Sequence, residues 1–367
     1  MSDDESSGYG LSGAGASEEF DAPALDYLPP KPKLHFPKIG LIGCGGISEY
    51  HLRAYREMGL DVLMVCDVNE EAATSRRDEF YPDAEVTTDY AEVLANDDIE
   101  VVDVTTHADV RVDIVEAALL AGKHVLSQKP FVLNLADGKR LADISQERGE
   151  LLAVNQNGRW APHFSYMHKA IEAGLIGRVG GVSISMQWDH RWVKGTPFDE
   201  MEDLILFDFA IHWFDMCCVF FAGQDVVSVS ASGSCTPYQT NHAPLLSQVM
   251  IQFDEGQATL SFNGDTEFGQ QDTTVVCGEK GTLRSSGPSL TEQTVTLYTA
   301  EGHATPELAG DWFTNGFQGT MGELLCAIEE GRQPYNNARG NLRSLAVCYA
   351  ALASAGDGGA PKVPEQI

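Results

Sequence analysis

The sequence contains no long apolar run and no paired cysteines. No stretch approaches the roughly 20 apolar residues that a membrane-spanning helix needs, so a membrane protein is not expected. The eight cysteines are scattered, with no CxxC pair of the kind found in zinc or redox motifs. Several lie in apolar segments, as buried free thiols do in a reducing compartment. We therefore expect a cytoplasmic protein. The zinc-binding motif HExxH is absent as well, so we expect no metal site.

Basic residues are also scarce. There are 24 Lys and Arg against 54 Asp and Glu, which gives a net charge of −30. Such a surface repels nucleic acid and anionic membranes, so neither is an expected partner. The first 30 residues have no Lys or Arg and lack the basic start and apolar core of a signal peptide. Their Ser, Gly, Asp and Glu content predicts that residues 1–37 form a disordered acidic tail.

What the sequence does contain is a regular alternation of strand and helix patterns. Apolar strands are expected at residues 39–43, 62–67, 99–106, 123–127 and 151–155, with helices between them. This predicts an α/β domain with a doubly wound parallel sheet over residues 38–157. After residue 157, alternating strands and short turns predict a mostly antiparallel sheet. Residues 158–367 are therefore expected to form a second α/β domain, ending in two helices.

A glycine-rich segment follows the first predicted strand. Gly43 would allow a tight turn there, and Gly45 would let the backbone approach a pyrophosphate. The amides of Gly46 and Ile47, at the start of the next helix, would then meet the phosphate charge. Ser48 stands where a third glycine or alanine is usual. The pattern predicts a dinucleotide-binding βαβ unit.

Asp67 ends the second predicted strand, about twenty residues beyond the glycines. Its carboxylate would accept hydrogen bonds from the adenosine ribose, which favours NAD over NADP. Arg76 and Arg77 lie downstream, where they could approach a 2′-phosphate. We regard NADP as the weaker alternative, because an acid at position 67 would repel that phosphate.

Two further strands end in polar residues at the same sheet edge, where ligands bind in open α/β sheets. Thr105 and Thr106 end one strand and would line the nicotinamide side. Lys129, between Gln128 and Pro130, follows another. A lysine there can bind a substrate hydroxyl, or act as acid or base. A surface lysine at a strand end is the alternative.

Asp208, His212 and Asp215 share one face of a predicted helix at residues 204–221. A carboxylate beside an imidazole fixes its tautomer and raises its basicity. A core histidine paired with a neighbouring acid is the alternative.

Two further segments combine aromatic and hydrogen-bonding side chains. This combination suits the faces and hydroxyls of a sugar ring, although such aromatics also fill cores. The candidates for substrate contact are Arg159, Trp160, Trp188, His190 and Trp192, with Asp208 and His212.

Together, three motifs resemble the glucose–fructose oxidoreductase / inositol dehydrogenase (Gfo/Idh/MocA) family. They are IGLIGCGGI at residues 39–47, AGKHVLSQKP at 121–130, and Asp208 with His212. The resemblance extends from Pro37 to about Val363. It implies a Rossmann domain followed by an α/β domain whose open sheet face commonly forms dimers or tetramers.

The resemblance also assigns roles. The family's Glu-Lys-Pro motif maps onto Gln128, Lys129 and Pro130, so Lys129 becomes the catalytic lysine, and Asp208 and His212 become its partners. Gln128 and Asn157 become cofactor contacts. Gln128 departs from the usual glutamate. Arg111 stands where many members have a histidine.

These roles imply NAD(P)-dependent oxidation or reduction of a hydroxyl on a sugar, sugar derivative or cyclitol. His212 would take the hydroxyl proton with help from Lys129, and Asp208 would orient His212. The formal base, Lys129 or His212, stays open. One alternative is a glycoside hydrolase that uses tightly held NAD in a transient oxidation. Another is a non-catalytic, NAD-responsive regulator on the same fold.

Overall fold

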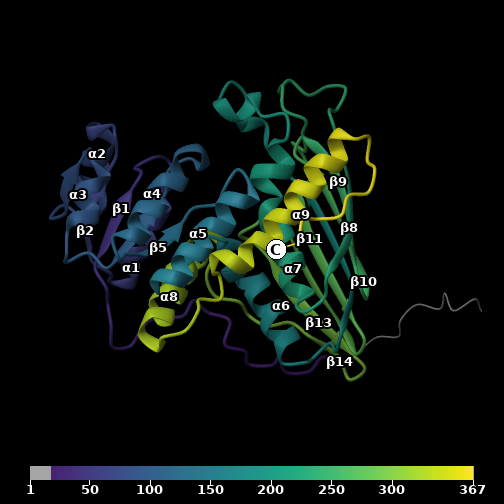
Figure 1. The fold of residues 1–367 in the computed structure, drawn as a ribbon. Helices are drawn as coiled ribbons and strands as arrows, with labels where there is room; N and C mark the ends of the chain where they lie inside the picture. Colours follow the sequence, from purple (N-terminus) through teal and green to yellow (C-terminus); the bar gives the residue numbers. More distant parts are fainter. Residues whose placement is uncertain (1–17, 367) are drawn as a thin grey trace, which may run out of the picture.

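The computed structural model describes residues 18–366, which build two sheets of different kinds. The first has six parallel strands in the order β3-β2-β1-β4-β5-β6 and lies on the left of Figure 1. The second has eight strands, in the order β14-β13-β12-β11-β7-β10-β9-β8. Only β7 and β10 pair in parallel there. The predicted fold class, a doubly wound parallel sheet joined to a mostly antiparallel one, is confirmed.

Strands and helices alternate through the first sheet. Its strands are β1 Ile39–Ile42, β2 Val62–Cys66, β3 Glu85–Thr87, β4 Val101–Val104, β5 His124–Ser127 and β6 Leu152–Val154. Its helices are α1 Ser48–Met58, α2 Glu70–Phe80, α3 Tyr90–Ala95, α4 Ala108–Leu120 and α5 Leu135–Arg148. β1 and β4 are buried at every position, because helices cover both faces of this sheet.

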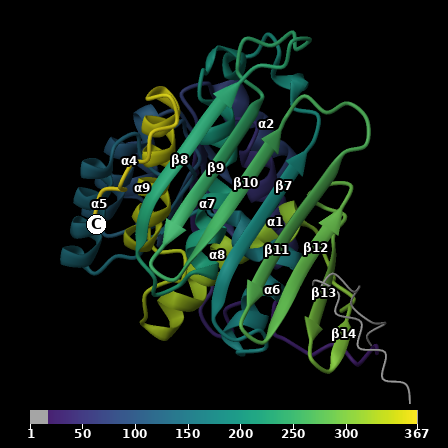
Figure 2. The same cartoon turned by 90° about the vertical axis from the view of Figure 1, so that its right-hand side faces the viewer.

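The second sheet is covered on one face only. Its strands are β7 Val179–Gln187, β8 Val226–Ser234, β9 Leu246–Phe253, β10 Gly256–Asn263, β11 Gln271–Gly278, β12 Gly281–Gly287, β13 Thr294–Thr299 and β14 Gly302–Ala304. Figure 2 looks onto the open face, with the helices behind it. Buried and exposed residues alternate along β9, for instance, with Gln248, Met250 and Gln252 on the open face.

The helices behind this sheet connect it to the first one. They are α6 Pro162–Glu172, α7 Ile211–Phe220, α8 Trp312–Glu330 and α9 Ala338–Gly356, with short turns η1 Asn157–Trp160, η2 Arg191–Val193 and η3 Pro197–Glu200. α8 packs on α1 and on η1. A side chain at Gly319 would clash with the Trp160 ring, and one at Gly322 with the carbonyl of Pro30. These glycines let α8 lie close to η1 and to the N-terminal segment.

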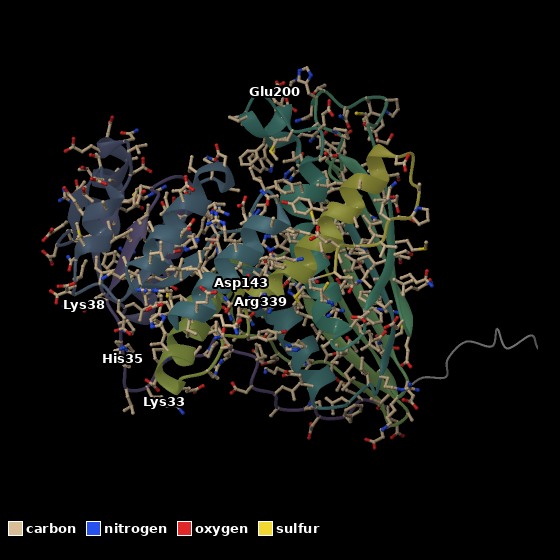
Figure 3. The ribbon with its side chains drawn as sticks, viewed as in Figure 1. Lys33, His35, Lys38, Asp143, Glu200 and Arg339 are labelled. Atoms are coloured by element: carbon tan, nitrogen blue, oxygen red, sulfur yellow. The ribbon has the colours of Figure 1, made fainter. Side chains whose placement is uncertain are left out.

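Residues 18–37 are not the disordered tail that composition predicted. The Phe20 amide donates to the carbonyl of His303 in β14, and the His303 amide donates to the carbonyl of Glu18. Ser165 Oγ donates to the Tyr27 carbonyl. Lys33, Leu34 and His35 lie beside α8; Lys33 and His35 are labelled in Figure 3. We call residues 18–37 the strap. Its apolar Phe20, Leu25 and Tyr27 pack on the core, which a count of acidic residues does not reveal. Predictions about residues 1–17 lie outside the described residues.

Within residues 18–366, no helix is both long enough and apolar enough to span a bilayer.

Candidate active site

The glycine-rich turn between β1 and α1 leaves an open cradle. Gly43 has φ of +105°, and an added Cβ would meet the Thr105 backbone at 2.9 Å. At Gly45 and Gly46, by contrast, an added Cβ would meet no atom within 4 Å. Ile47 at the N-cap of α1 has no side-chain acceptor for the first amides of the helix. A pyrophosphate fits this arrangement of open backbone and helix N-terminus.

Asp67 lies beside this cradle at the end of β2. Its Oδ2 accepts from the Cys44 amide at 2.7 Å and its Oδ1 from the Asn69 amide at 2.9 Å, so the backbone fixes the carboxylate. Arg76 also reaches the turn, where it donates to Ser48 Oγ at 3.2 Å and pairs with Glu49 and Glu79.

Lys129 joins the two domains at the end of β5. Its Nζ lies 3.0 Å from Asp208 Oδ1 and 2.9 Å from the Asp208 carbonyl oxygen. The peptide bond between Lys129 and Pro130 is cis. Burial opposes ionisation of Asp208, but the Lys129 charge outweighs it and holds the pKa of that carboxyl below its ordinary value. Asp208 is therefore ionised at neutral pH.

Asp208 lies in a π-helical turn, η4 Ile205–Phe209, rather than in a continuous α-helix as predicted. The amide of Ala210 donates to the carbonyl of Ile205, five residues back, and α7 starts only at Ile211. The wider turn changes the direction of side chains, and such turns occur frequently at functional sites.

His212 lies in the first turn of α7, where the charges of Lys129 and Asp208 act on it. Burial, and then the Lys129 charge, lowers the pKa of His212 to about 3, so the imidazole is uncharged at neutral pH. Its Nδ1 is buried without a hydrogen-bond partner among residues 18–366. Asp208 accepts its hydrogen bond from Lys129, so it acts on His212 through charge rather than through a hydrogen bond.

A buried polar network that the sequence analysis missed lies behind Lys129. His51 Nδ1 lies 2.7 Å from Asp103 Oδ2, which also accepts from Tyr55. On the other side, His51 Nε2 lies 3.2 Å from Gln128 Nε2. Gln128 Oε1 in turn accepts from the Lys129 amide at 2.6 Å. A signal was present in the sequence: Asp103 is the one acid in an apolar strand, and a buried carboxylate needs partners.

Arg111 connects the two loops at this sheet edge. Its guanidinium donates to the carbonyl of Thr106 on one loop and to the carbonyls of Gln128 and Pro130 on the other. It is 2% exposed, and burial lowers its pKa to about 9. Thr105 Oγ1 donates to the Gly43 carbonyl. Hydrogen bonds thus connect the loops that follow β1, β4 and β5, which contain the predicted cofactor residues, along one edge of the first sheet.

The predicted substrate residues divide into two groups. Trp188, His190 and Trp192 lie together at the end of β7; the His190 ring centre is 5.4 Å from that of Trp188 and 5.1 Å from that of Trp192. Lys129 and Asp208 are among the charges that act on His190. The structure therefore brings this aromatic group to the Lys129–Asp208 pair.

Arg159 and Trp160 belong to the core instead, which corrects their assignment to the substrate. Arg159 is 7% exposed, and its guanidinium donates to both oxygens of Asp215 and to the carbonyl of Tyr335. Trp160 is 6% exposed and packs under Gly319. Asn157, a predicted cofactor contact, is 5% exposed and accepts from Trp312 Nε1.

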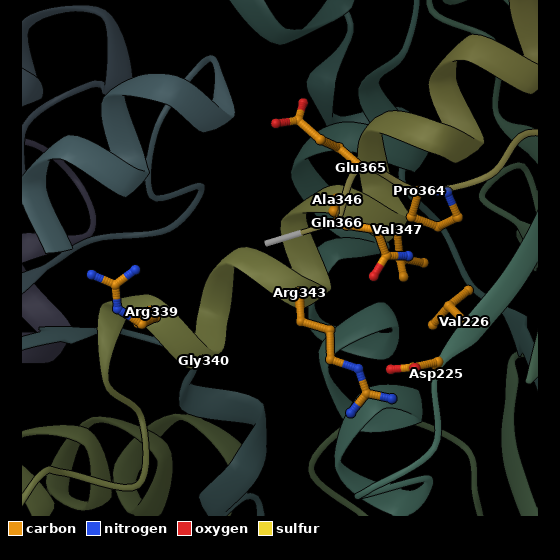
Figure 4. A pocket seen from close by; sticks show the side chains of 10 residues that line it. All are labelled: Asp225, Val226, Arg339, Gly340, Arg343, Ala346, Val347, Pro364, Glu365 and Gln366. Carbon is orange, nitrogen blue, oxygen red and sulfur yellow. The ribbon is translucent and has the colours of Figure 1, made fainter. Parts of the chain in front are cut away.

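A cavity of about 250 Å³ lies elsewhere, between α9, the start of β8 and the C-terminal segment (Figure 4). Arg343 extends into it but donates to the carbonyls of Cys218, Phe221 and Gln224 at the end of α7. Arg339 pairs with Asp143 of α5. These arginines hold helix ends together, and the cavity contains none of the predicted site residues.

Two family models match the chain. The one described as an oxidoreductase family with an NAD-binding Rossmann fold matches residues 37–156, and the Gfo/Idh/MocA C-terminal domain matches residues 164–284. D-apiose dehydrogenase of Paraburkholderia graminis is 27% identical over 346 residues, 88% of each chain. Inositol 2-dehydrogenase of Rhizobium meliloti is 27% identical, over 86% of this chain and 96% of that protein.

Among solved structures, an oxidoreductase from Agrobacterium radiobacter in complex with NAD⁺, L-tartaric acid and magnesium has a similar fold. The TM-score is 0.81 at 20% identity, over 90% of this chain and 98% of that one.

Proposed function

Because the chain belongs to the Gfo/Idh/MocA family of NAD-binding oxidoreductases, we propose that it transfers a hydride between the nicotinamide cofactor and a ring hydroxyl or ketone of a sugar, sugar derivative or cyclitol. The observation that carries this proposal is the Lys129–Asp208 pair, which joins the two domains at the end of β5, in the same sheet as the glycine cradle after β1. The names of the similar dehydrogenases, which act on apiose and inositol, support the substrate class.

In the proposed site, the cofactor's pyrophosphate binds at Gly45, Gly46 and Ile47, and its adenosine ribose binds at Asp67. When bound, NAD supplies the hydride acceptor. Asp67 supports NAD over NADP. Arg76, the arginine nearest the turn, is paired with Glu49 and Glu79, so a 2′-phosphate would have to compete with two carboxylates.

The protein's own part in the proposed reaction is to hold and move one proton. Lys129 donates a hydrogen bond to the reacting hydroxyl and stabilises the negative charge that develops on its oxygen. His212, uncharged at neutral pH, takes the proton. Asp208 fixes the Lys129 ammonium in place through the 3.0 Å contact. Gln128 fixes the backbone amide of the same lysine.

We further propose a homodimer or homotetramer formed through the open face of the second sheet, and a location in the cytoplasm. Exposed Met250 and Tyr298 lie on that face among Ser, Thr and Gln side chains. Six of the eight cysteines are buried and none forms a disulfide within residues 18–366, which suits a reducing compartment.

The test is formation of NADH at 340 nm with NAD and a panel of neutral sugars, cyclitols and sugar acids. We expect Lys129→Ala and His212→Ala each to lose roughly 10²–10⁴-fold in kcat/KM while NADH binding, followed by fluorescence, is kept. Lys169→Ala on the surface of α6 is the matched control and should retain activity. NADH binding without oxidation of any panel member would contradict the proposal and favour the internal-redox glycosidase or the regulator. Assays of glycoside cleavage would then separate those two.

A further inference from the structure

The peptide unit between Gly45 and Gly46 lies in the middle of the glycine cradle, and neither residue restrains it by itself. An added Cβ at either glycine would meet no atom within 4 Å, so no neighbouring group packs closely there. Both residues also lack the Cβ that limits backbone rotation in other residues. Rotation of this peptide unit therefore costs little unless another group fixes it.

The orientation of this peptide unit decides whether the cradle attracts or repels an anion. In a planar trans peptide, the carbonyl of Gly45 and the amide of Gly46 point in opposite directions. When the carbonyl points away from the cofactor, the amide points toward it and can donate to a phosphate oxygen. Rotated by half a turn, the same unit would present its carbonyl oxygen to the phosphate, and the two negative ends would repel each other.

Three donors hold the Gly45 carbonyl oxygen. They are the Ser48 amide at 3.2 Å, Ser48 Oγ at 2.6 Å and Arg76 Nη2 at 3.4 Å. The shortest of these contacts comes from the side chain of Ser48, which is buried. Ser48 stands where a third glycine or alanine is usual, so the unusual residue supplies the strongest restraint on the carbonyl.

Arg76 determines the direction of the Ser48 hydroxyl. Its Nε lies 3.2 Å from Ser48 Oγ, and because guanidinium nitrogens only donate, Oγ must accept with a lone pair. The hydroxyl proton is then free to point at the Gly45 carbonyl. Arg76 is itself held between α1 and α2, since its Nη1 lies 3.5 Å from Glu49 and 3.4 Å from Glu79.

We propose that Ser48 and Arg76 are positioning residues that fix the Gly45–Gly46 peptide unit, so that the Gly46 amide faces the cofactor's pyrophosphate. We call the Ser48 hydroxyl and the Arg76 guanidinium the peptide latch. The latch gives a role to the serine in the glycine motif, and it gives Arg76 a role other than binding a 2′-phosphate. The inference rests on the proposed function only through cofactor binding, so its test needs no turnover.

The first test measures the Kd for NADH by fluorescence. Ser48→Ala removes the hydroxyl and should raise this Kd by about five- to tenfold, as expected for the loss of one hydrogen bond. Arg76→Gln should raise it several-fold. Because both side chains act on one carbonyl, the double variant should raise the Kd by less than the product of the two single effects.

Arg140→Gln is the matched control for Arg76→Gln. Arg140 lies on α5 of the same domain and pairs with Glu116 and Asp137 instead of the turn. This variant should bind NADH as the parent does.

Gly46→Ala tests the peptide rotation itself. Gly46 does not have a positive φ, and rotating the peptide by half a turn would give it one, which alanine resists. Ser48→Ala should therefore raise the Kd for NADH less in the Gly46→Ala background than in the parent, whatever the added methyl group does to binding by itself. An equal rise in both backgrounds would show that Ser48 does not act through this rotation and would overturn the inference.

NADPH separates the latch from recognition of a 2′-phosphate. Both cofactors contain the same pyrophosphate, so Arg76→Gln should weaken their binding by the same factor. A larger loss for NADPH would assign Arg76 to the 2′-phosphate and overturn its part in the latch. Unchanged NADH binding in both Ser48→Ala and Arg76→Gln would overturn the whole inference and leave the proposed function standing. Failure of the parent to bind NADH would instead contradict the proposed function.

Discussion

Arg159 and Asp215 form a buried ion pair with two parallel hydrogen bonds, from Nε to Oδ2 at 2.6 Å and from Nη2 to Oδ1 at 2.8 Å. Ser344 of α9 adds a third hydrogen bond to the same carboxylate at 2.7 Å. The pair joins η1, α7 and α9 in the core. Its importance is structural, although Arg159 looked like a substrate residue in the sequence.

Asp215→Ala should therefore lower the free energy of unfolding by about 3–5 kcal/mol, because it leaves a buried guanidinium without its partner. Denaturation in urea measures this loss. Asp225→Ala, at an exposed carboxylate, should change it by less than about 0.5 kcal/mol. Equal effects of the two substitutions would contradict the structural role of the pair.

Gln128 and Asn155 determine which nitrogen of His51 carries the proton, because each places an amide nitrogen 3.2 Å from His51 Nε2. Since Gln128 Oε1 accepts from the Lys129 amide, its NH₂ group faces His51 Nε2, which must accept. Gln128→Glu would turn this into an acceptor facing an acceptor, and His51 should become protonated at both nitrogens. The ¹⁵N chemical shift of Nε2 reports this directly. Gln146→Glu, at an exposed site on α5, should leave the shift unchanged. If Nε2 stayed unprotonated in Gln128→Glu, the Asn155 amide alone would determine where the His51 proton lies, and Gln128 would not.

Asp272 is predicted to make stability depend on pH. It is 2% exposed in β11, and burial raises its pKa from 3.8 to about 7. Between these two values the folded protein binds more protons at this group than the unfolded chain does. The free energy of unfolding therefore falls as pH rises through this window, by roughly 3–5 kcal/mol from this group.

Asp272→Asn removes this titration. Relative to the parent, the variant should gain stability between about pH 4 and pH 7 and show no further gain above that range. Asp113→Asn, at an exposed carboxylate on α4, should run parallel to the parent across the same range. A constant difference between Asp272→Asn and the parent would contradict the assignment.

Glu329 holds the strap on α8. Its carboxylate accepts from the amides of Lys33, Leu34 and His35, with the shortest distance, 2.6 Å, to Leu34. These backbone hydrogen bonds hold the pKa of Glu329 below its ordinary value. Glu329→Gln loses the charge that strengthens them. Cleavage by trypsin after Lys33 should then become several-fold faster.

The neighbouring Glu330 pairs with Arg332 rather than with the strap, so Glu330→Gln is the matched control and should be cut at the parental rate. If both variants were cut equally fast, Glu329 would not be what holds the strap.

Much of the fold was predictable because its signals are local. The apolar strand before Gly43, the glycines themselves and Asp67 lie within thirty residues of sequence, and each reports a constraint of its own backbone. The proximity of Lys129 and Asp208 came from motif resemblance rather than from periodicity. The structure then provides the contact between them.

The missed features depend on partners that are distant in sequence. Arg159 binds Asp215, which is 56 residues away in the sequence, and the sequence around Arg159 does not reveal this partner. His51 likewise binds Asp103, which is 52 residues away. The π-helical turn at Asp208 changes a hydrogen-bond register and leaves the residue pattern intact. β12 is hard to recognise in the sequence, because Arg284, Ser285 and Ser286 obscure its alternation.

The strap also has a consequence for how the chain is made. Lys33 and Glu329 are 296 residues apart, so the strap leaves the ribosome long before α8 exists. At about 5–20 residues per second, it waits roughly 15–60 s for its binding surface. The first domain can form its parallel sheet during that time. Docking of the strap therefore has to wait for the synthesis of α8, 296 residues after the strap itself is translated.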